Sequence, residues 1–524
     1  MKTIRYLILV LVLFVSNVCF SQFGTLDVAF GTEGKVITPF EGFDASVQSV
    51  LVQPDKKIVA GGSVSKSAKS QFSLARYNSD GSLDETFGNL GLVIADYPEQ
   101  MVLSNIVLQS DGKIIAGGNL YNPTFSISHF VLLRFDSNGV LDTAFGNDGR
   151  VVTNFSDKLD RMTSLIVQSD GKIIASGSTS DDLNYSDFAL ARYNSDGSDD
   201  LIFGNNGRTI SSIRTWDFGY AIALQDDDKI IVSGATSNEF NPDFGFDYDF
   251  AVLKYDKYGL LDSTFGNGGS ITIGVPEANE KALYVKVAPD GNISIVGEHH
   301  ILKYSIMLVQ ILNNGDLDTS FGTTGVVTTA LTSQFLESVA MQPDGKILAT
   351  EYNSTGGCCG AEIKLIRLLA NGNFDATFGT DGVVTTDFSN ENSQANSIAI
   401  QEDGKIVIGG ISGNQIQSNY GLARFNTELQ LSNPVSQLVN HTFLVYPNPI
   451  NNSINLDFNF GESGKVSADL FDINGVLIFN LLNKKEFQPG LNSQLLQVPE
   501  SLSKGVYFLT VSNGSKVSNF KLVK

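Results

Sequence analysis

Short hydrophobic runs, separated by glycine, aspartate and asparagine, cover most of the chain. Runs of this kind, rich in valine, isoleucine and aromatic residues, predict β-strands. The Asp-Gly pair at 111–112 leaves room only for a tight hairpin turn, whose positive φ angles this pair tolerates. No stretch shows sustained helical periodicity, so an all-β fold is predicted. In one representative unit the predicted strands are 92–97, 104–110, 113–119 and 130–136.

Three phrases recur in a constant order along the chain. They are exemplified by LDETFGNLGLV at 83–93, QSDGKI at 109–114 and FVLLRFDSNG at 130–139. Successive copies are spaced by about 57 residues, a period that indicates a repeat architecture built from one supersecondary unit. The phenylalanine of the first phrase falls at Phe30, Phe87, Phe145, Phe203, Phe265, Phe321 and Phe378.

Seven four-stranded units predict a seven-bladed β-propeller over residues 22–430, because a ring lets each sheet bury its faces on its neighbours. An open solenoid is the alternative, but no unit shows the polar outer face of a capping repeat. The recurring phenylalanine is predicted to lie as a wedge between blades. Burial of one phenylalanine contributes about 1.5–3 kcal/mol, so stability alone explains the repetition.

A different domain is predicted after a linker at 431–441. Residues 442–524 alternate hydrophobic and polar positions and contain Asn-Gly turns at 474–475 and 513–514. This pattern predicts a small Ig-like β-sandwich.

The other end of the chain predicts a signal peptide over residues 1–21. Lys2 and Arg5 precede an apolar run too short to span a membrane, and cleavage is expected after Ser21. A lipoprotein signal acylated at Cys19 is the alternative. No later apolar run reaches transmembrane length, so the mature chain is expected to be exported without a membrane-spanning segment.

Charge and cysteine content narrow the classes of partner. The chain has 56 acidic against 35 basic residues, a formal net charge of −21, which disfavours nucleic acid as a partner. Outside the leader the cysteines are Cys358 and Cys359, which either form a vicinal disulfide or remain loop thiols. The chain is therefore not a disulfide scaffold.

On its three recurring phrases the chain resembles the delta-60 repeat proteins, over about residues 23–430. This resemblance implies a β-propeller fold and implies no common activity.

Short motifs recur in order along the C-terminal domain. They are formed by Tyr446, Pro447, Asn448, Pro449, Gly505, Val506, Tyr507, Phe508, Lys521 and Lys524. On these residues the domain resembles the sorting domain of proteins exported by the type IX secretion system of Bacteroidetes-type bacteria. The resemblance implies that the type IX machinery is a partner and that the protein is secreted or attached to the outer cell surface. It also implies that the domain is removed, or exchanged for an anchor, after export.

Patterns typical of catalysis or metal binding are scarce. His299 and His300 are adjacent and would point to opposite faces of a strand, which disfavours a shared zinc ion. The sequence has no phosphate-binding glycine loop of the GxxxxGK[ST] type. Aspartates in the turns could bind calcium, but Asp and Asn before Gly are equally explained by backbone geometry. No catalytic residue, metal site or cofactor is predicted, with calcium left open.

One variable loop carries the candidate ligand site. The connection between the predicted third and fourth strands is long in the fourth unit, at 235–250, and short in the fifth. Variable loops on a rigid scaffold commonly carry binding sites, and aromatic rings beside carboxylates suit a sugar. The alternative is a loop that packs on its own aromatic residues. The candidate residues are Glu239, Phe240, Asp243, Phe244, Phe246, Asp247 and Tyr248.

The sequence therefore predicts an exported, non-enzymatic binding or adhesion protein whose ligand is an extracellular glycan or protein. Two alternatives remain open: a secreted propeller hydrolase or lyase acting on polysaccharide, and a structural component of the surface layer.

Overall fold

The computed structural model describes much of residues 23–524, and the chain separates into two compact units, Met1–Gln430 and Leu431–Lys524. The predicted signal peptide, the linker at 431–441 and both Cys358 and Cys359 lie outside the described residues. The residues left undescribed are 1–22, 68, 123–126, 157–158, 183–184, 239, 242–244, 276–277, 302, 332–334, 354–361, 390–391, 414–416, 428–443, 447–452, 461–462, 473–475, 500–501, 504 and 513–516.

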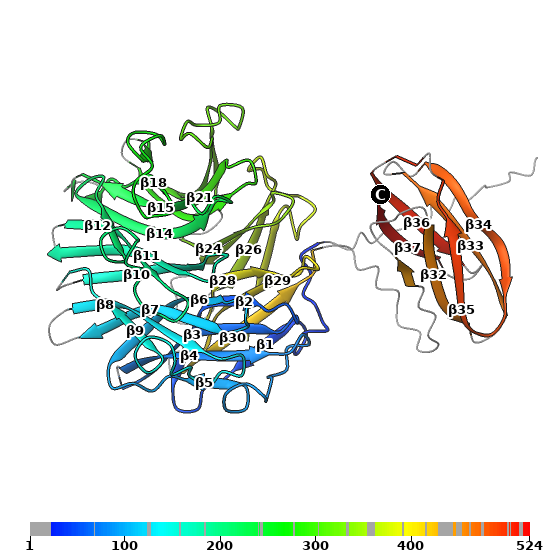
Figure 1. The fold of residues 1–524 in the computed structure, drawn as a ribbon, viewed down its shortest axis with the longest axis horizontal. Helices are drawn as coiled ribbons and strands as arrows, with labels where there is room; N and C mark the ends of the chain where they lie inside the picture. Colours follow the sequence, from blue (N-terminus) through cyan, green and yellow to red (C-terminus); the bar gives the residue numbers. More distant parts are fainter. Residues whose placement is uncertain are drawn as a thin grey trace, which may run out of the picture. The chain divides into compact units, whose positions relative to one another are not determined.

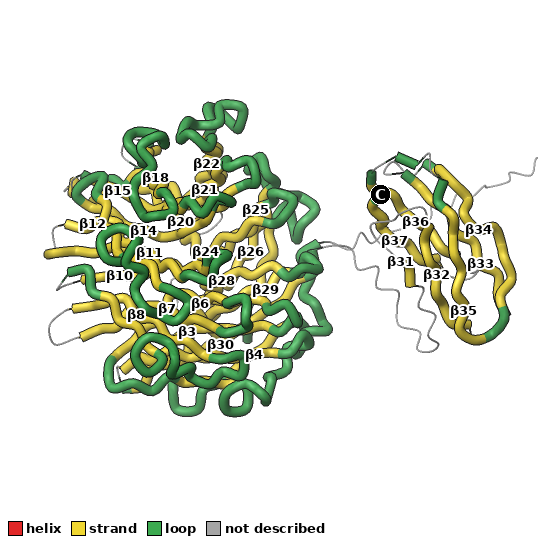
Figure 2. The backbone as a smooth tube through the Cα atoms, in the orientation of Figure 1, coloured by secondary structure: helices red, strands yellow, loops and turns green. Residues whose placement is uncertain are grey.

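Every named element of the described residues is a β-strand, which confirms the all-β class (Figure 2). Within the described part of the chain, no helix is long and apolar enough to span a membrane.

The strands of the first unit fall into four-stranded antiparallel sets, numbered here along the chain. Sets 2, 3 and 4 join into one twelve-stranded sheet through single parallel pairs, Leu159 with Ser128 and Ser186 with Trp216. Set 1 contains β2 (Asp44–Val52), β3 (Ile58–Lys66), β4 (Lys69–Tyr77) and β5 (Leu92–Ile94). Set 2 contains β6 (Gln100–Leu108), β7 (Ile114–Asn122), β8 (Ile127–Phe135) and β9 (Arg150–Thr153). Set 3 contains β10 (Leu159–Val167), β11 (Ile173–Asp182), β12 (Tyr185–Tyr193) and β13 (Arg208–Ser211).

The remaining sets repeat this order. Set 4 contains β14 (Trp216–Leu224), β15 (Ile230–Ser237), β18 (Asp249–Tyr255) and β19 (Ser270–Ile273), with a hairpin of β16 (Phe240–Asn241) and β17 (Gly245–Phe246) inserted after β15. Set 5 contains β20 (Asn279–Val287), β21 (Ile293–His300), β22 (Tyr304–Ile311) and β23 (Val326–Ala330). Set 6 contains β24 (Phe335–Met341), β25 (Ile347–Asn353), β26 (Glu362–Leu368) and β27 (Val383–Thr386). Set 7 contains β28 (Asn392–Ile400), β29 (Ile406–Gly413), β30 (Ser418–Phe425) and β1 (Lys35–Thr38).

The sets form a closed cycle. The first strand of each set contacts the first strand of the next, from β2 through β6, β10, β14, β20 and β24 to β28, and β28 contacts β2 again. In Figure 1 the first strands of the chain accordingly lie beside β29 and β30. The contacts are those of a propeller and not of an open solenoid, because the two ends of the array cover each other.

The grouping of strands differs from the sequence-based expectation in one respect. Residues 92–97 were expected to open a unit, but β5 pairs with β4 and completes the preceding set. In the same way β1 pairs with β30 of the last set, with Lys35 opposite Ala423. The strand after each FG phrase folds back on the strand before it, and a hydrophobic pattern does not reveal which neighbour a strand pairs with. One N-terminal strand therefore closes the ring.

The phenylalanine of the FG phrase lies at the interface between sets, as predicted. Phe87 is fully buried in a cluster that joins Phe72 of set 1 to Met101 and Val131 of set 2. A Cβ on Gly139 of set 2 would lie 2.8 Å from the Phe87 ring, and this glycine has a φ of +80°. Six of the seven copies have no exposed surface, whereas Phe321 is only partly buried.

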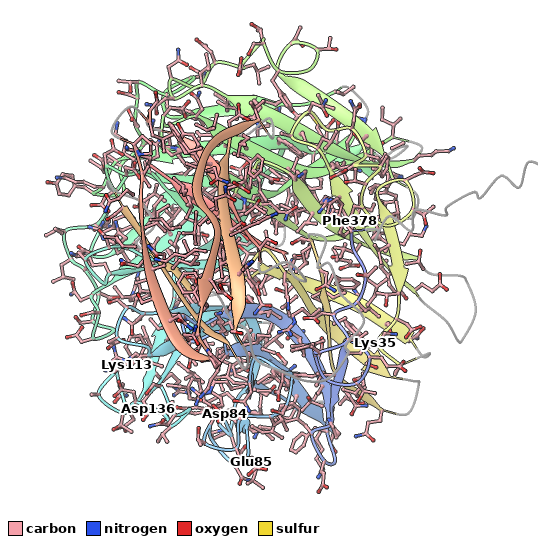
Figure 3. All side chains as sticks on the ribbon, turned by 90° about the vertical axis from the view of Figure 1, so that its right-hand side faces the viewer. Lys35, Asp84, Glu85, Lys113, Asp136 and Phe378 are labelled. Carbon is pink, nitrogen blue, oxygen red and sulfur yellow. The ribbon has the colours of Figure 1, made fainter. Side chains whose placement is uncertain are left out.

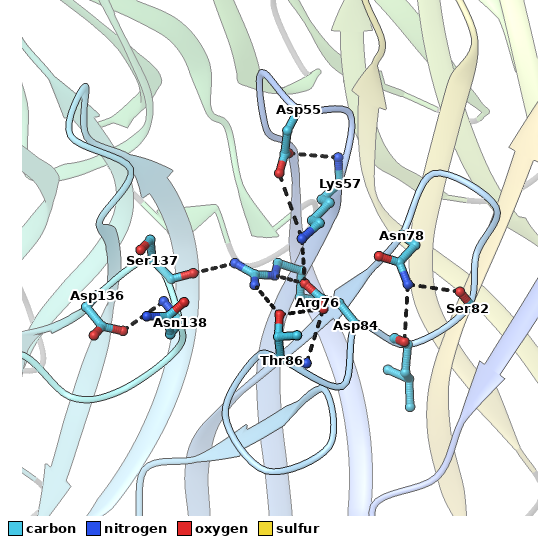
Figure 4. Close-up of polar contacts among 11 residues, drawn as sticks. Asp55, Lys57, Arg76, Asn78, Ser82, Asp84, Thr86, Asp136, Ser137 and Asn138 are labelled. Carbon is cyan, nitrogen blue, oxygen red and sulfur yellow. Dashed lines mark hydrogen bonds and ion pairs between the residues drawn. The ribbon is translucent and has the colours of Figure 1, made fainter.

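A charged cluster holds the FG phrase in sets 1, 2, 3, 6 and 7. Arg76 lies 4.5 Å from the centre of the Phe87 ring and donates a 2.7 Å hydrogen bond from Nε to Asp84 (Figure 4). Lys57 contacts the same carboxylate at 2.9 Å, and Arg76 also donates to the carbonyl oxygen of Ser137 in set 2. Each cluster therefore ties one set to the next. The equivalent ion pairs are Arg134–Asp142, Arg192–Asp200, Arg367–Asp375 and Arg424–Asp27.

These clusters lie among densely packed side chains around the ring. Figure 3 shows Asp84, Lys113 and Asp136 in one part of the domain, where sets 1 and 2 adjoin. Set 5 lacks the ion pair, because Gln310 replaces the arginine and Asn292 replaces the lysine. The partial exposure of Phe321 accompanies this loss.

The Asp27→Asn variant is expected to lower the free energy of unfolding by about 2–3 kcal/mol, since Arg424 and Lys405 would lose a charge-assisted partner. Arg424 is 5% exposed, so water can replace little of the hydrogen bonding that its guanidinium group would lose. Chemical denaturation measures the effect. The matched control is Asp318→Asn in set 5, which has no basic partner among the described residues at this position and is expected to cost under about 1 kcal/mol. Equal losses would show that the ion pair does not strengthen ring closure.

The second unit has two sheets around one core. The sheets are β31 (Leu444–Tyr446), β32 (Ser453–Phe460) and β35 (Gly490–Gln497), and β34 (Leu477–Phe487), β33 (Gly464–Phe471), β36 (Val506–Ser512) and β37 (Val517–Val523). Residues of both sheets, among them Ile454, Leu470 and Leu509, share one buried cluster. Its Ig-like character stays a prediction.

Candidate functional site

The variable loops of the ring lie at one end of the sheets, where the second strand of each set ends and the third begins. In set 4 this connection joins β15 to β18 and carries the β16–β17 hairpin. The starts of β14 and β20 and the end of β21 lie at the same end of their sheets, because neighbouring strands of a set are antiparallel. The candidate site is built from these ends.

The structure places only part of the predicted ligand site. Glu239, Asp243 and Phe244 lie outside the described residues. Phe240 is paired with Phe246 in the register of the hairpin. Two further candidates follow the hairpin: Asp247 is exposed, and the partly buried ring of Tyr248 packs edge-on against Phe218 at 5.9 Å.

A buried acid–imidazole pair lies at the start of β20. Nδ1 of His299 is 2.8 Å from Oε1 of Glu280, and the amide of Val275 donates to the same oxygen at 3.2 Å. Glu280 has no exposed surface, and its Oε2 has no hydrogen-bond partner among the described residues. Burial, reinforced by the nearby charges of Asp249 and Asp247, raises the pKa of Glu280 to about 8.

His299 completes a pair that is uncharged near neutral pH. Burial and the adjacent His300 lower the pKa of His299 below its usual value. His300 lies on the other face of the strand and stacks on Tyr304 at 4.1 Å between ring centres. The two histidines therefore have separate surroundings, as their adjacency in a strand predicted.

The pair occupies a position that recurs in neighbouring sets. In set 3, Asp160 lies opposite Thr179. Its carboxylate accepts hydrogen bonds from the Thr179 hydroxyl and from the backbone amide of Phe155. In set 4, Asp217 lies opposite Thr236. Its carboxylate accepts hydrogen bonds from the Thr236 hydroxyl and from the backbone amide of Ile213. Each buried carboxyl thus holds the loop that precedes its strand.

Set 5 uses this same position, with Glu280 opposite His299 where sets 3 and 4 have aspartate opposite threonine. The sequence reasoning missed these acids, although each is a single carboxylate inside a hydrophobic strand. That signal marks a buried polar group that requires partners. The nearby ion pair between Arg214 and Asp249 adds a further charged contact beneath the hairpin.

The Glu280→Gln variant is expected to remove a pH dependence of stability. The folded-state pKa of about 8 lies above the ordinary value of 4.5, so the carboxyl's contribution is complete below pH 4.5 and is lost as the pH rises through 8. Between pH 5 and pH 9 the parent should lose on the order of 2–4 kcal/mol relative to the variant. Denaturation curves across this range provide the measurement.

Asp217→Asn is the control for that experiment. Burial raises the pKa of Asp217 to about 6, so its contribution is lost at lower pH and is almost constant between pH 7 and pH 9. A parent and a Glu280→Gln variant with parallel pH profiles would contradict the assignment of a protonated Glu280.

The described residues contain no group of three or more His, Cys, Asp or Glu side chains arranged to hold a metal ion. Calcium binding therefore has no geometric support from the described residues and stays a prediction.

Except for Tyr446 in β31, the described sorting residues lie in the last part of the second unit, from Gly505 to Lys524. Gly505 and Lys524 exchange two backbone hydrogen bonds of 3.1 and 2.9 Å, which fix the chain end beside the start of β36. Tyr507 is buried and donates from its hydroxyl to the carbonyl oxygen of Ser503 at 2.9 Å, whereas Phe508 is exposed. Tyr446 and Lys521 lie in β31 and β37, and Pro447, Asn448 and Pro449 lie outside the described residues.

Family models match segments of both units. Residues 444–524 match the family described as the secretion system C-terminal sorting domain. Segments of the first unit match the domain of unknown function (DUF5122) β-propeller, at 53–87, 109–145, 168–201, 342–378 and 401–431. No curated protein matches the chain. The β-propeller class and the resemblance to a type IX sorting domain are thereby confirmed.

Several solved structures are similar to the chain at low identity. The polysaccharide lyase Uly1 has 10% identity and a TM-score of 0.44, over 78% of this chain and 98% of its own. Sqt1 from Chaetomium thermophilum has 12% identity and a TM-score of 0.40, over 80% and 94%. The β-propeller domain of the Trilobed protease from Pyrococcus furiosus has 11% identity and a TM-score of 0.38, over 76% and 99%.

Proposed function

We propose that this chain, which joins β-propeller repeats to a type IX secretion sorting domain, is a non-enzymatic binding or adhesion protein. The sorting domain marks it as an exported protein, secreted or attached to the cell surface. The observation that carries the proposal is this combination, since a rigid ring with variable loops on one end is suited to recognition outside the cell.

The buried Glu280–His299 pair supports binding over catalysis. Its position matches those of Asp160 and Asp217, which hold loops in sets 3 and 4. Glu280 has no exposed surface, whereas a general acid or base must reach its substrate within hydrogen-bond distance. The pair therefore has a structural explanation. A polysaccharide-acting enzyme and a structural surface-layer component remain the alternatives that the experiment must separate.

The ligand is proposed to bind at the loop of set 4, through Glu239, Phe240, Asp243, Phe244, Phe246, Asp247 and Tyr248. Two observations support this placement. The hairpin brings Phe240 opposite Phe246, and the carboxylate of Asp247 is exposed beside it. Aromatic rings with adjacent polar groups suit a neutral glycan, and the carboxylates suit calcium as a bridging ion.

Isothermal titration of the mature chain with neutral hexasaccharides, with and without calcium, tests this proposal. Binding should strengthen with calcium and fall at least tenfold when Phe244 and Phe246 are both changed to alanine. A double variant that binds like the parent would remove this loop from consideration. New reducing ends or unsaturated sugar products, detected in the same mixtures, would favour the enzyme instead.

A further inference from the structure

The same end of the ring carries two hollows in sets 1 and 2, away from the loop of set 4. One cavity of about 520 Å³ lies between the ends of β3 and β7 and the starts of β6 and β8. A second cavity of about 600 Å³ lies beside the ends of β3 and β5. Both are lined by Ser67 and Lys69, so the two hollows adjoin across the tip of the β3–β4 hairpin. Their volumes are those of small-molecule sites.

Each hollow combines an aromatic ring with polar side chains. Tyr121 lines the first, together with Leu120, Gln100 and His129. Phe43 lines the second, together with Ile94 and Gln71. The apolar face of a sugar packs on an aromatic ring while its hydroxyls bond to amides and imidazole, so this composition suits carbohydrate.

Hydrogen bonds and an ion pair hold the backbone and side chains next to both hollows in place. Gln71, which is 3% exposed, donates to the carbonyl oxygen of Glu99 at 2.8 Å and accepts from the amide of Tyr97 at 2.9 Å. Arg150 contacts Oε1 of Glu99 at 3.3 Å and lies 4.9 Å from the centre of the Tyr97 ring. Residues 96–100, which contribute to the lining of both hollows, are therefore preorganised, and this reduces the entropy lost on binding.

One polar group of the first cavity retains hydrogen-bonding capacity. His129 lines this cavity and approaches Asp160 through Nδ1 at 3.5 Å. Its Nε2 makes no hydrogen bond to the described residues, so it can bond to a sugar hydroxyl.

The charges around the hollows balance. Lys66 and Lys69 are matched by Asp96 and Glu99. Lys69 contacts Asp96 at 3.3 Å, and Lys66 lies 5.4 Å from the centre of the Phe43 ring. No excess charge is left to hold an ionic ligand, and the chain as a whole, at −21, repels anionic polymers. The ligand chemistry that fits is uncharged.

We propose that an uncharged oligosaccharide binds across both cavities, with one sugar against Tyr121 and another against Phe43. This inference rests on the proposed binding function and places a second glycan site in sets 1 and 2, separate from the site proposed at the loop of set 4. The shared lining by Ser67 and Lys69 makes the occupant an extended chain of sugars spanning the hairpin tip.

The test uses the mature full-length chain and hexasaccharides of β-1,3-glucan, β-1,4-glucan, β-1,4-mannan, β-1,4-xylan and α-1,4-glucan, with sulfated and uronate-containing hexasaccharides as a separate arm. Titration calorimetry should show binding of at least one neutral hexasaccharide and at least tenfold weaker binding by Tyr121→Ala. Tyr121→Phe, which keeps the ring, should bind within about threefold of the parent. The matched control is Tyr185→Ala, at an exposed position of β12 that is 59% accessible and does not line either cavity.

Each other outcome overturns the inference. It fails if no neutral hexasaccharide binds, if only the charged arm binds, or if Tyr121→Ala binds like the parent. Circular dichroism verifies that each variant is folded, and Phe43→Ala gives a second, independent loss at the other cavity. Loss of binding only in the set 4 double variant would reject this location while preserving the proposed function. No glycan binding, with normal export, would reject the glycan and leave a protein ligand to be sought.

Discussion

Deleting residues 442–524 is expected to leave a folded propeller in the periplasm and to reduce the exported protein by at least tenfold. The two units have separate hydrophobic cores, so the first unit does not need the second for its packing. The second unit matches the sorting domain, which carries the export signal. Immunoblots of periplasm, cell surface and medium measure the distribution, and far-ultraviolet circular dichroism of the truncated protein measures its fold.

A matched pair of variants separates loss of the sorting fold from loss of length. Leu522 is 1% exposed in the core of the second unit, so Leu522→Asp should unfold that unit and block export as the deletion does. Lys484→Asp introduces the same residue at an exposed position of β34 and should be exported normally. Normal amounts of the truncated protein in the medium would show that the domain is not the export signal.

Phe265→Ala is expected to lower the free energy of unfolding of the propeller by about 3–5 kcal/mol, through a cavity between sets 4 and 5. The Phe265 ring has no exposed surface and packs in a cluster that joins Phe250 of set 4 to Val285 and Ile293 of set 5. Trp216 is the one tryptophan of the chain and lies in β14, so its fluorescence reports on the unfolding of the propeller.

Phe321→Ala is the internal control for this prediction. Phe321 holds the same place in the FG phrase but is only partly buried, and set 5 lacks the basic side chain that lies over the ring in the other sets, which is Lys254 for Phe265. Its removal should cost about 1–2 kcal/mol, because less contact and a smaller cavity are involved. Equal midpoints for the parent and Phe265→Ala would show that the ring does not stabilise the interface.

The candidate site was only partly predictable from the sequence. The loop of set 4 could be recognised because an insertion changes the length and the composition of a loop, and both can be read directly from the sequence. The acids beneath it did not, because Asp160, Asp217 and Glu280 become equivalent only when the strands are aligned in register. The hollows in sets 1 and 2 are lined by residues from five separate segments. No pattern along the chain predicts that these segments lie side by side.

The sequence by itself determined the strands, the hairpin turns, the repeat and the C-terminal sorting domain, whereas the signal peptide stays a prediction. These depend on local rules: alternation of side chains, positive φ at Asp-Gly and Asn-Gly, and short motifs such as the FG phrase. The wedge role of the FG phenylalanine also followed from the sequence, since a large apolar residue repeated in every unit requires burial.

Only the tertiary structure decided which strands pair, and with them the closure of the ring. β5 belongs with β4, and β1 completes the set of β28, β29 and β30, although nothing in either short strand distinguishes one partner from another. The tertiary structure also decided that Glu280 faces His299 away from water, which sets its protonation state. The physical reason is the same in both cases. The alternation of apolar and polar residues specifies which face of a strand is buried. The strand's pairing partner, the depth at which a side chain is buried and the dielectric surroundings of that side chain depend on residues distant in the chain.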